Sequence, residues 1–252
     1  FLLGQSTEFG TDAYIDLSTM AKIKENADAN NKTDIYEVDF ADNDTMGVHV
    51  LTGAYPHFKY DPMNILYVVS NNGNSLTTKD SAITLSKDSV SILAYYPYKT
   101  PYDPAYELKV FSVQKDQSTY KNFKKSNFMN AMMKDCSANN LNVKLVFSPR
   151  TALVFVHYKG SDAKSIQQLT IPALTTSSQS GPSGEISKVN MYKYKEVSDS
   201  EVIWAAFLAA EQTFDNTVIE YTDGKQNFQC DAISNVTIKS GKVNTIQVSQ
   251  GK

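Results

Sequence analysis

Few residues in this chain have the types and spacing that metal binding requires. Residues 42–47 (Asp-Asn-Asp-Thr-Met-Gly) begin like a calcium-binding loop. Such a loop needs an oxygen ligand at its fifth position and a glutamate at its twelfth, and Met46 and Gly53 occupy those positions. We therefore interpret the segment as a turn that leads into a strand.

The other residues capable of chemistry are equally scattered. The three histidines, His49, His57 and His157, have no spacing that would bring the three or four ligands of a zinc site together. No nucleophile elbow or phosphate-binding glycine loop is present, and residues 181–184 (Gly-Pro-Ser-Gly) are one residue short of the elbow. We predict that the protein is not an enzyme and holds no metal or cofactor. A hydrolase stays open as an alternative, because paired carboxylates need not be close in sequence.

The two cysteines, Cys136 and Cys230, are too few for a disulfide scaffold or a cysteine-rich metal site. One structural disulfide would be compatible with an exported protein. We favour the alternative of two buried, unpaired thiols.

Charge and hydropathy exclude two further classes of function. The net charge is −3, and Arg150 is the only arginine, so a nucleic-acid partner is not expected. No run of 18 apolar residues is present that would span a membrane. Because the chain begins at Phe1 rather than methionine, we expect a processed product from which an export signal or N-terminal lipid anchor has been removed.

The composition and the periodicity favour β-strands. Tyr, Phe, Val, Ile and Thr are abundant, helical periodicity is rare, and the 252 residues suffice for two domains. A polar stretch at 114–127 reads as a long loop, and Ser126 could cap a short helix containing Met129 and Met133. We predict an all-β chain of two tandem antiparallel β-sandwiches, with few short helices and domains at 1–139 and 140–252. The expected strands lie at 33–40, 46–52, 63–70, 81–85, 89–96, 106–113, 142–147, 151–158, 165–171, 186–194, 201–209, 216–222 and 226–230.

Two segments are candidate binding elements. Residues 236–248 alternate on both sides of Ser240-Gly241, which predicts a C-terminal β-hairpin. Residues 88–98 form a strand that runs into tyrosines, and Tyr95, Tyr96, Tyr98 and Tyr102 are a candidate aromatic contact patch. Such a patch can stack on sugar rings or partner side chains, but tyrosines in a strand can also fill a sandwich core, which is the interpretation we favour.

Several of these segments, in order, resemble the fimbrillins, which build the type V pili of Gram-negative bacteria. Phe40, Asp44, Gly47 and Val48 are similar to a family strand entry, and 94–98 (Ala-Tyr-Tyr-Pro-Tyr) is similar to a second strand. Residues 128–138, 146–155 and 240–248 resemble the segment between domains, the opening of the second domain and the chain end. Two departures are Ser148-Pro149, where a histidine is common, and Asn244, where an aromatic residue is usual.

The resemblance implies two transthyretin-like, Greek-key sandwiches in a secreted lipoprotein of the outer membrane and cell surface. It implies assembly with other fimbrial subunits by strand exchange, and adhesion to host or bacterial receptors or glycans. The candidate donor residues are Val243, Thr245, Ile246 and Val248. Stalk members are trimmed after an arginine near the first strand, but none precedes Arg150. A trimmed chain, another protease, and an accessory, tip or anchor role all stay open, as does the alternative of a glycan-binding surface lipoprotein that uses the tyrosine patch.

Overall fold

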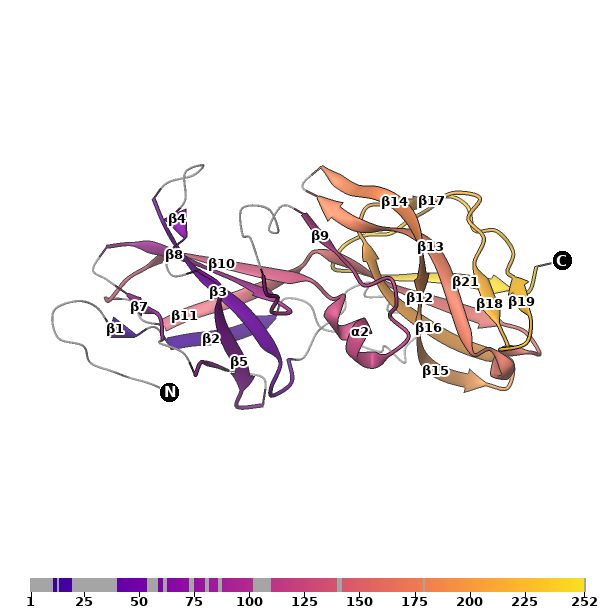
Figure 1. Ribbon diagram of the computed structural model, residues 1–252, viewed down its shortest axis with the longest axis horizontal. Helices are drawn as coiled ribbons and strands as arrows, with labels where there is room; N and C mark the ends of the chain where they lie inside the picture. The colour runs from indigo at the N-terminus through magenta and orange to yellow at the C-terminus, as the bar shows by residue number, and fades with distance from the viewer. Residues whose placement is uncertain are drawn as a thin grey trace, which may run out of the picture. The chain divides into compact units, whose positions relative to one another are not determined.

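The computed structural model describes residues 11–12, 14–19, 40–53, 59–60, 63–72, 75–79, 82–85, 88–101, 110–139, 142–178 and 180–251. Nearly all regular structure in these residues is β-strand, and the helices there are α2 (Tyr120–Lys125) and the short 3₁₀ helix η1 (Ala163–Ser165). The predicted all-β class is confirmed. The strands divide between two compact units (Figure 1).

The first unit is built from an eight-stranded sheet that closes on itself and from a separate two-stranded sheet formed by its first and seventh strands. Its strands are β1 (Thr11–Asp12), β2 (Tyr14–Thr19), β3 (Thr45–Thr52), β4 (Lys59–Tyr60), β5 (Ile65–Ser70), β6 (Ser75–Thr77), β7 (Thr84–Leu85), β8 (Val90–Tyr96), β10 (Met129–Cys136) and β11 (Asn142–Pro149). The hydrogen-bonded order is β4-β3-β5-β6-β2-β11-β10-β8, and β8 also pairs with β3. Alternate residues of β11, Val143, Leu145 and Phe147, enter the enclosed core and are fully buried.

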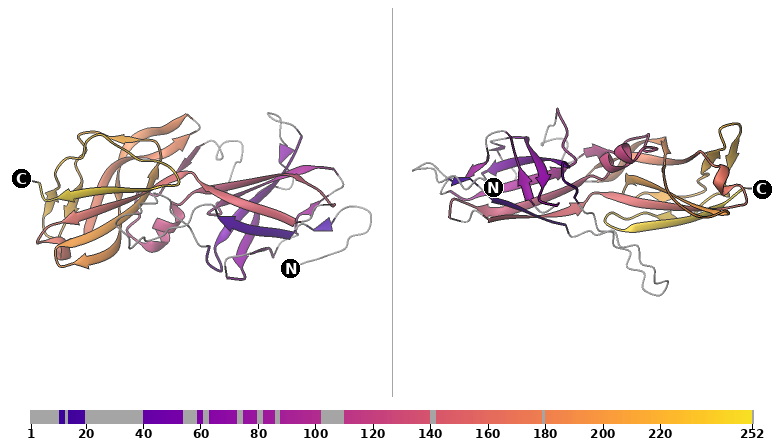
Figure 2. Two further views of the ribbon diagram at one scale, coloured as in Figure 1. Left: turned by 180° about the vertical axis from the view of Figure 1, so that it is seen from behind. Right: turned by 90° about the horizontal axis from the view of Figure 1, so that it is seen from below.

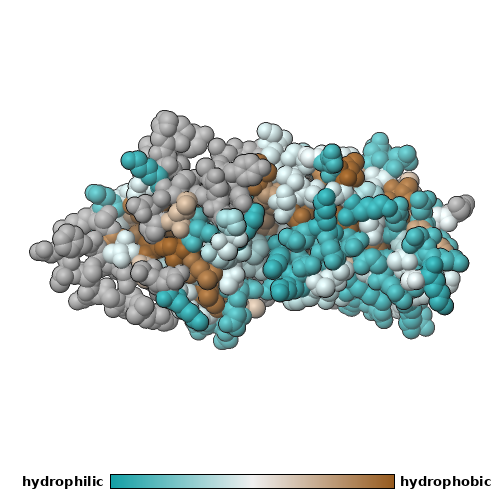
Figure 3. All heavy atoms as spheres, in the orientation of Figure 1, coloured by the Kyte–Doolittle hydropathy of each residue, from teal (hydrophilic) through white to brown (hydrophobic). Residues whose placement is uncertain are grey.

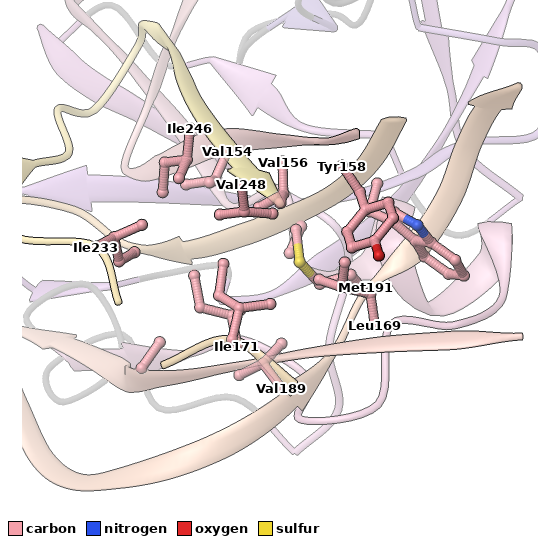
Figure 4. Packing of buried hydrophobic residues seen from close by; sticks show 14 of the residues in the cluster. Val154, Val156, Tyr158, Leu169, Ile171, Val189, Met191, Ile233, Ile246 and Val248 are labelled. Carbon is pink, nitrogen blue, oxygen red and sulfur yellow. The ribbon is translucent and has the colours of Figure 1, made fainter. Parts of the chain in front are cut away.

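The second unit is a two-sheet sandwich. Its strands are β9 (Val110–Ser112), β12 (Thr151–Lys159), β13 (Gln168–Ser178), β14 (Gly181–Asn190), β15 (Tyr192–Ser198), β16 (Glu201–Ala209), β17 (Thr213–Phe214), β18 (Glu220–Thr222), β19 (Asn227–Gln229), β20 (Val236–Thr237) and β21 (Val243–Ser249). One sheet has the order β15-β16-β12-β21. The other has the order β14-β13-β18-β19, with β9 also paired to β13. Side chains of β12 and β21 face those of β13 and β14 across the interior (Figure 4).

The two units do not follow the sequence division at 139/140. The chain enters the second unit with β9 and α2, returns to the first for β10 and β11, and leaves it again at the end of β11. β10 belongs to the first unit because it pairs with β8, where Ala131 lies opposite Ala94. The predicted boundary therefore assigns β11 to the wrong unit, since pairing partners rather than polarity decide where each segment lies.

The prediction of a short helix capped by Ser126 is wrong. Residues 129–136 are strand β10, in which Met129 and Ala131 are buried while Met132 is exposed. The helix of this region is α2, inside the stretch expected to be a loop, and the Thr119 side chain caps it by accepting the backbone N–H of Asn122. An apolar run this short is compatible with the period of a helix and with that of a strand. Pairing with the neighbouring strand β8 stabilises the extended conformation.

The prediction of a C-terminal hairpin is also wrong, although Ser240 and Gly241 do form a turn, with Gly241 at φ +66°. β20 pairs with β17, whereas β21 pairs with β12 in parallel. Flanking alternation predicts two strands but cannot specify which strands they pair with. The predictions that concern residues 20–39 and His57 cannot be compared with the structure, because these residues lie outside the described part of the chain.

Candidate functional site

The tyrosine segment lies in β8, opposite the glycine of β3. Gly47 and Tyr95 are Cα partners in the ladder, and the Tyr95 ring occupies the space that a Cβ on residue 47 would need. The Tyr95 hydroxyl donates to Asn64 Oδ1 at 2.6 Å, and the ring stacks on His49 with centroids 5.6 Å apart. The glycine and the tyrosine are therefore one packing unit, which explains why both occur in these two strands.

The candidate aromatic contact patch does not form at the surface. Tyr95 is 0% exposed and Tyr96 is 3% exposed, so neither ring can stack on a ligand from solvent. Tyr96 instead packs edge-on against Phe40 at 5.3 Å, and Phe40 against Phe147 at 5.2 Å. Tyr98 is half-buried, and Tyr102 lies outside the described residues. Tyr95 and Tyr96 have the core-filling role favoured above.

The candidate donor residues lie together on β21. Ile246 and Val248 point into the core of the second unit, where they are 3% and 6% exposed. Figure 4 shows both side chains beside Val154 and Val156 of the neighbouring strand. Thr245 is exposed and Val243 is half-buried. The candidate donor strand is thus part of its own sheet, and its alternating apolar residues complete the core of its own unit.

β21 is the outermost strand of its sheet (Figure 2). Its ladder with β12 runs in parallel from Leu153↔Val243 to Lys159↔Ser249. Asn244 fixes the entry to this strand: its Nδ2 donates to the carbonyls of Leu153, Lys239 and Lys242, and its Oδ1 accepts from Lys239 N–H. Asn244, one of the two departures from the fimbrillin pattern, therefore stabilises the turn before β21 through its side-chain amide.

A second parallel pairing involves the other end of the chain. β2 pairs in parallel with β11, from Asn142↔Tyr14 to Phe147↔Thr19, and it contacts β6 through Asp16↔Ser75. β11 and β12 follow each other directly in the chain, and each has one parallel partner, β2 for β11 and β21 for β12. Sequence reasoning missed this arrangement, because parallel partners so far apart leave no local signal.

The described residues contain no group of three His, Cys, Asp or Glu side chains that could hold a metal ion. Cys136 and Cys230 are both buried and unpaired, which confirms the prediction of free thiols. Burial raises the pKa of the Cys230 thiol to about 12, so it stays protonated at neutral pH. None of the helices in the described ranges has the length and apolar character needed to span a bilayer.

A family model described as fimbrillin-like matches residues 27–252. A proposed cell adhesion protein from Bacteroides ovatus superposes with a TM-score of 0.68 at 12% identity, covering 96% of each chain. A second one, from Bacteroides uniformis, gives 0.63 at 14% identity, covering 95% of this chain and 96% of that chain. A fimbrial protein from Bacteroides ovatus gives 0.52 at 14% identity over 96% of this chain and 49% of that chain. At these identities the likeness shows the fold, and no curated protein sequence gives a significant match.

Proposed function

The chain belongs to the fimbrillin-like family, and from this premise we propose that it is a structural or accessory subunit of a cell-surface fimbrium that joins neighbouring subunits by exchanging β-strands. The proposed partners are other fimbrial subunits. Backbone edges, rather than reactive side chains, carry this function.

The observation that carries the proposal is the matching position of β2 and β21, each of which pairs in parallel with one of two consecutive strands. β21 pairs in parallel with β12, and β2 pairs in parallel with β11. If β2 leaves, a strand entering from another subunit can adopt beside β11 the pairing that β21 already makes beside β12. We propose that β21 is this donor. It has seven residues, and β2, the strand that it would replace, has six.

The side chains of the proposed groove favour an apolar strand. Removal of β2 would uncover Val143, Leu145 and Phe147, which are fully buried on β11. Covering one such side chain again contributes about 1.5–3 kcal/mol. Ile246 and Val248 alternate with exposed residues, so they could fill this groove while Thr245 and Gln247 face outward. Hydrogen bonds lost from β12 would be replaced by bonds to β11, and burial of the open groove would have to offset the apolar surface that β21 uncovers in its own core.

A disulfide staple tests whether β21 must leave its own sheet. His157 and Gln247 are Cα partners on β12 and β21, so cysteines at both positions can lock the strand in place. The variant would carry Cys136→Ala and Cys230→Ala to prevent mispairing, and residues 1–20 would be deleted to open the acceptor. We expect monomers when the staple is oxidised and multimers after reduction, measured by size-exclusion chromatography with light scattering.

The matched control places the staple at Ser198 and Glu201, which are partners on β15 and β16. This staple leaves β21 free, so multimers should form under both conditions. Equal assembly of the two oxidised proteins would exclude β21 as the donor.

We also propose that the protein reaches the surface as a secreted, outer-membrane lipoprotein, for which the family resemblance is the only support. Intact-mass spectrometry of the protein taken from cells measures its N-terminus and any attached acyl chains. An unacylated N-terminus would exclude the anchor without affecting strand exchange.

A further inference from the structure

We propose that the second unit binds a neutral oligosaccharide in a groove beside β18 and β19. The groove has a volume of about 840 Å³ and is lined by residues of β13, β14, β18, β19 and the chain after β21. A volume of this size accommodates a small ligand such as a short sugar chain. The groove is present in the single, unassembled chain, so sugar binding there does not depend on strand exchange.

Two aromatic residues line the groove, Tyr221 and Phe228, and Phe228 is the less buried of the two. Phe228 is half-buried, and its ring stacks on Tyr221 with centroids 5.1 Å apart and planes 18° apart. The Tyr221 hydroxyl is in turn fixed, because it donates to Asp162 at 2.8 Å. A ring supported on one face offers a flat apolar surface, against which the C–H face of a pyranose can pack.

Polar groups that suit hydroxyls surround the ring. Gln168, Gln229 and Gln250, which have amide side chains, are among the residues that line the groove, together with Asp231. An amide can donate and accept hydrogen bonds at once, which matches a sugar hydroxyl that does the same. Mixed amides and carboxylates around one aromatic ring therefore favour a carbohydrate over an apolar ligand.

The charges in the groove disfavour an anionic ligand. Lys188 is the only cationic side chain among the lining residues, and its Nζ lies 2.6 Å from Glu220 Oε2. A phosphate or sulfate would have to compete with Glu220 for this lysine and would also lie near Asp231. The expected ligand is therefore neutral.

Two of the polar groups are already held in position. Gln168 Nε2 donates to the carbonyls of Leu169 and Met191, at 2.8 and 3.1 Å, so its Oε1 is the atom that would accept from a sugar hydroxyl. Asp231 Oδ2 accepts the Ser249 hydroxyl at 3.0 Å. Groups that are ordered before binding lose little conformational entropy when a ligand arrives.

The test uses the full chain as a monomer on an array of neutral glycans built from hexoses and N-acetylhexosamines, followed by calorimetry of each glycan bound. Phe228→Leu keeps an apolar side chain in the core and removes the flat ring, so affinity should fall about 10-fold. Gln229→Ala changes an exposed residue and should lower affinity about 3- to 10-fold through one lost hydrogen bond. Binding should not change when salt is raised, because the ligand carries no charge.

Gln247→Ala is the matched control, since Gln247 is also an exposed glutamine but lies on β21 away from the groove lining. Its affinity should equal that of the unmodified chain. Binding that survives both groove variants would place the sugar elsewhere, and no binding to any neutral glycan would exclude the site. Release of new reducing ends would instead identify a hydrolase and overturn the assignment as a binding groove. None of these results depends on whether stapling β21 blocks assembly.

Discussion

At the scale of single residues, the contacts around Tyr95 explain why its two strands carry a glycine and a histidine. The ring fills the space above Gly47 and stacks on His49, while its hydroxyl is bound to Asn64. We expect Gly47→Ala to destabilise the first unit by about 3 kcal/mol or more, because the new methyl group overlaps a fully buried ring. Urea unfolding measures the loss. In a Tyr95→Ala background the same change should cost far less, and equal costs in both backgrounds would contradict the packing argument.

The same cluster predicts a dependence of stability on pH. Burial lowers the pKa of His49 to about 4, and its Nδ1 accepts the N–H of Asn64 at 2.8 Å. Below pH 6.5 the unfolded chain binds a proton at His49 that the folded chain does not bind. The free energy of unfolding should therefore fall between pH 6.5 and 4, by up to about 1.4 kcal/mol per pH unit from this residue. His49→Asn retains an acceptor but does not titrate, so its unfolding energy should depend less on pH over this range. Parallel profiles for the two proteins would rule out His49 as the cause.

At the scale of elements, β21 belongs to its own sheet before any exchange. Ile246→Ala should destabilise the second unit by about 2–4 kcal/mol, since the side chain is buried between two sheets. Gln247→Ala, on the outward face of the same strand, should change stability by no more than about 0.5 kcal/mol. Urea unfolding followed by fluorescence of Trp204, the single tryptophan, which lies in the second core, measures both. Equal losses of stability in the two variants would mean that the Ile246 side chain is not packed in this core. A deletion of 236–252 would also damage this core, so a staple tests the donor role more cleanly than a truncation.

At the scale of the whole molecule, the path of the chain makes each unit depend on segments from both sides of residue 139. A fragment 1–139 lacks β11, and with it three fully buried side chains of the first core. A fragment 140–252 lacks β9 and α2, including Phe123, which packs on Phe207 of β16 at 4.8 Å. We expect 1–139 to be unfolded and 1–149 to regain cooperative thermal unfolding, measured by circular dichroism. A cooperative transition in 1–139 would show that β11 is dispensable.

Local patterns predicted many of the strands well. The expected strand 201–209 coincides with β16, and 46–52, 89–96 and 151–158 differ from β3, β8 and β12 by one residue at an end. Each of these has a dense run of β-forming residues that no helix period fits. The run around Met129 and Met133 fits either period, and there the prediction of a helix was wrong. The groove was not predicted either, because Phe228, Gln168 and Gln250 are distant in sequence and carry no motif.

Composition and local patterns were enough to predict an all-β chain of two domains without a recognisable catalytic motif, and the order of its segments revealed the resemblance to the fimbrillins. Those properties depend on composition and on the alternation of side chains within a few residues. The strand partners, the parallel pairing of β2 and β21, and the burial of Tyr95 and Tyr96 became known from the three-dimensional fold alone. The physical reason is that a strand exposes equivalent backbone donors and acceptors to any neighbour, so its partner is selected by the packing of distant segments.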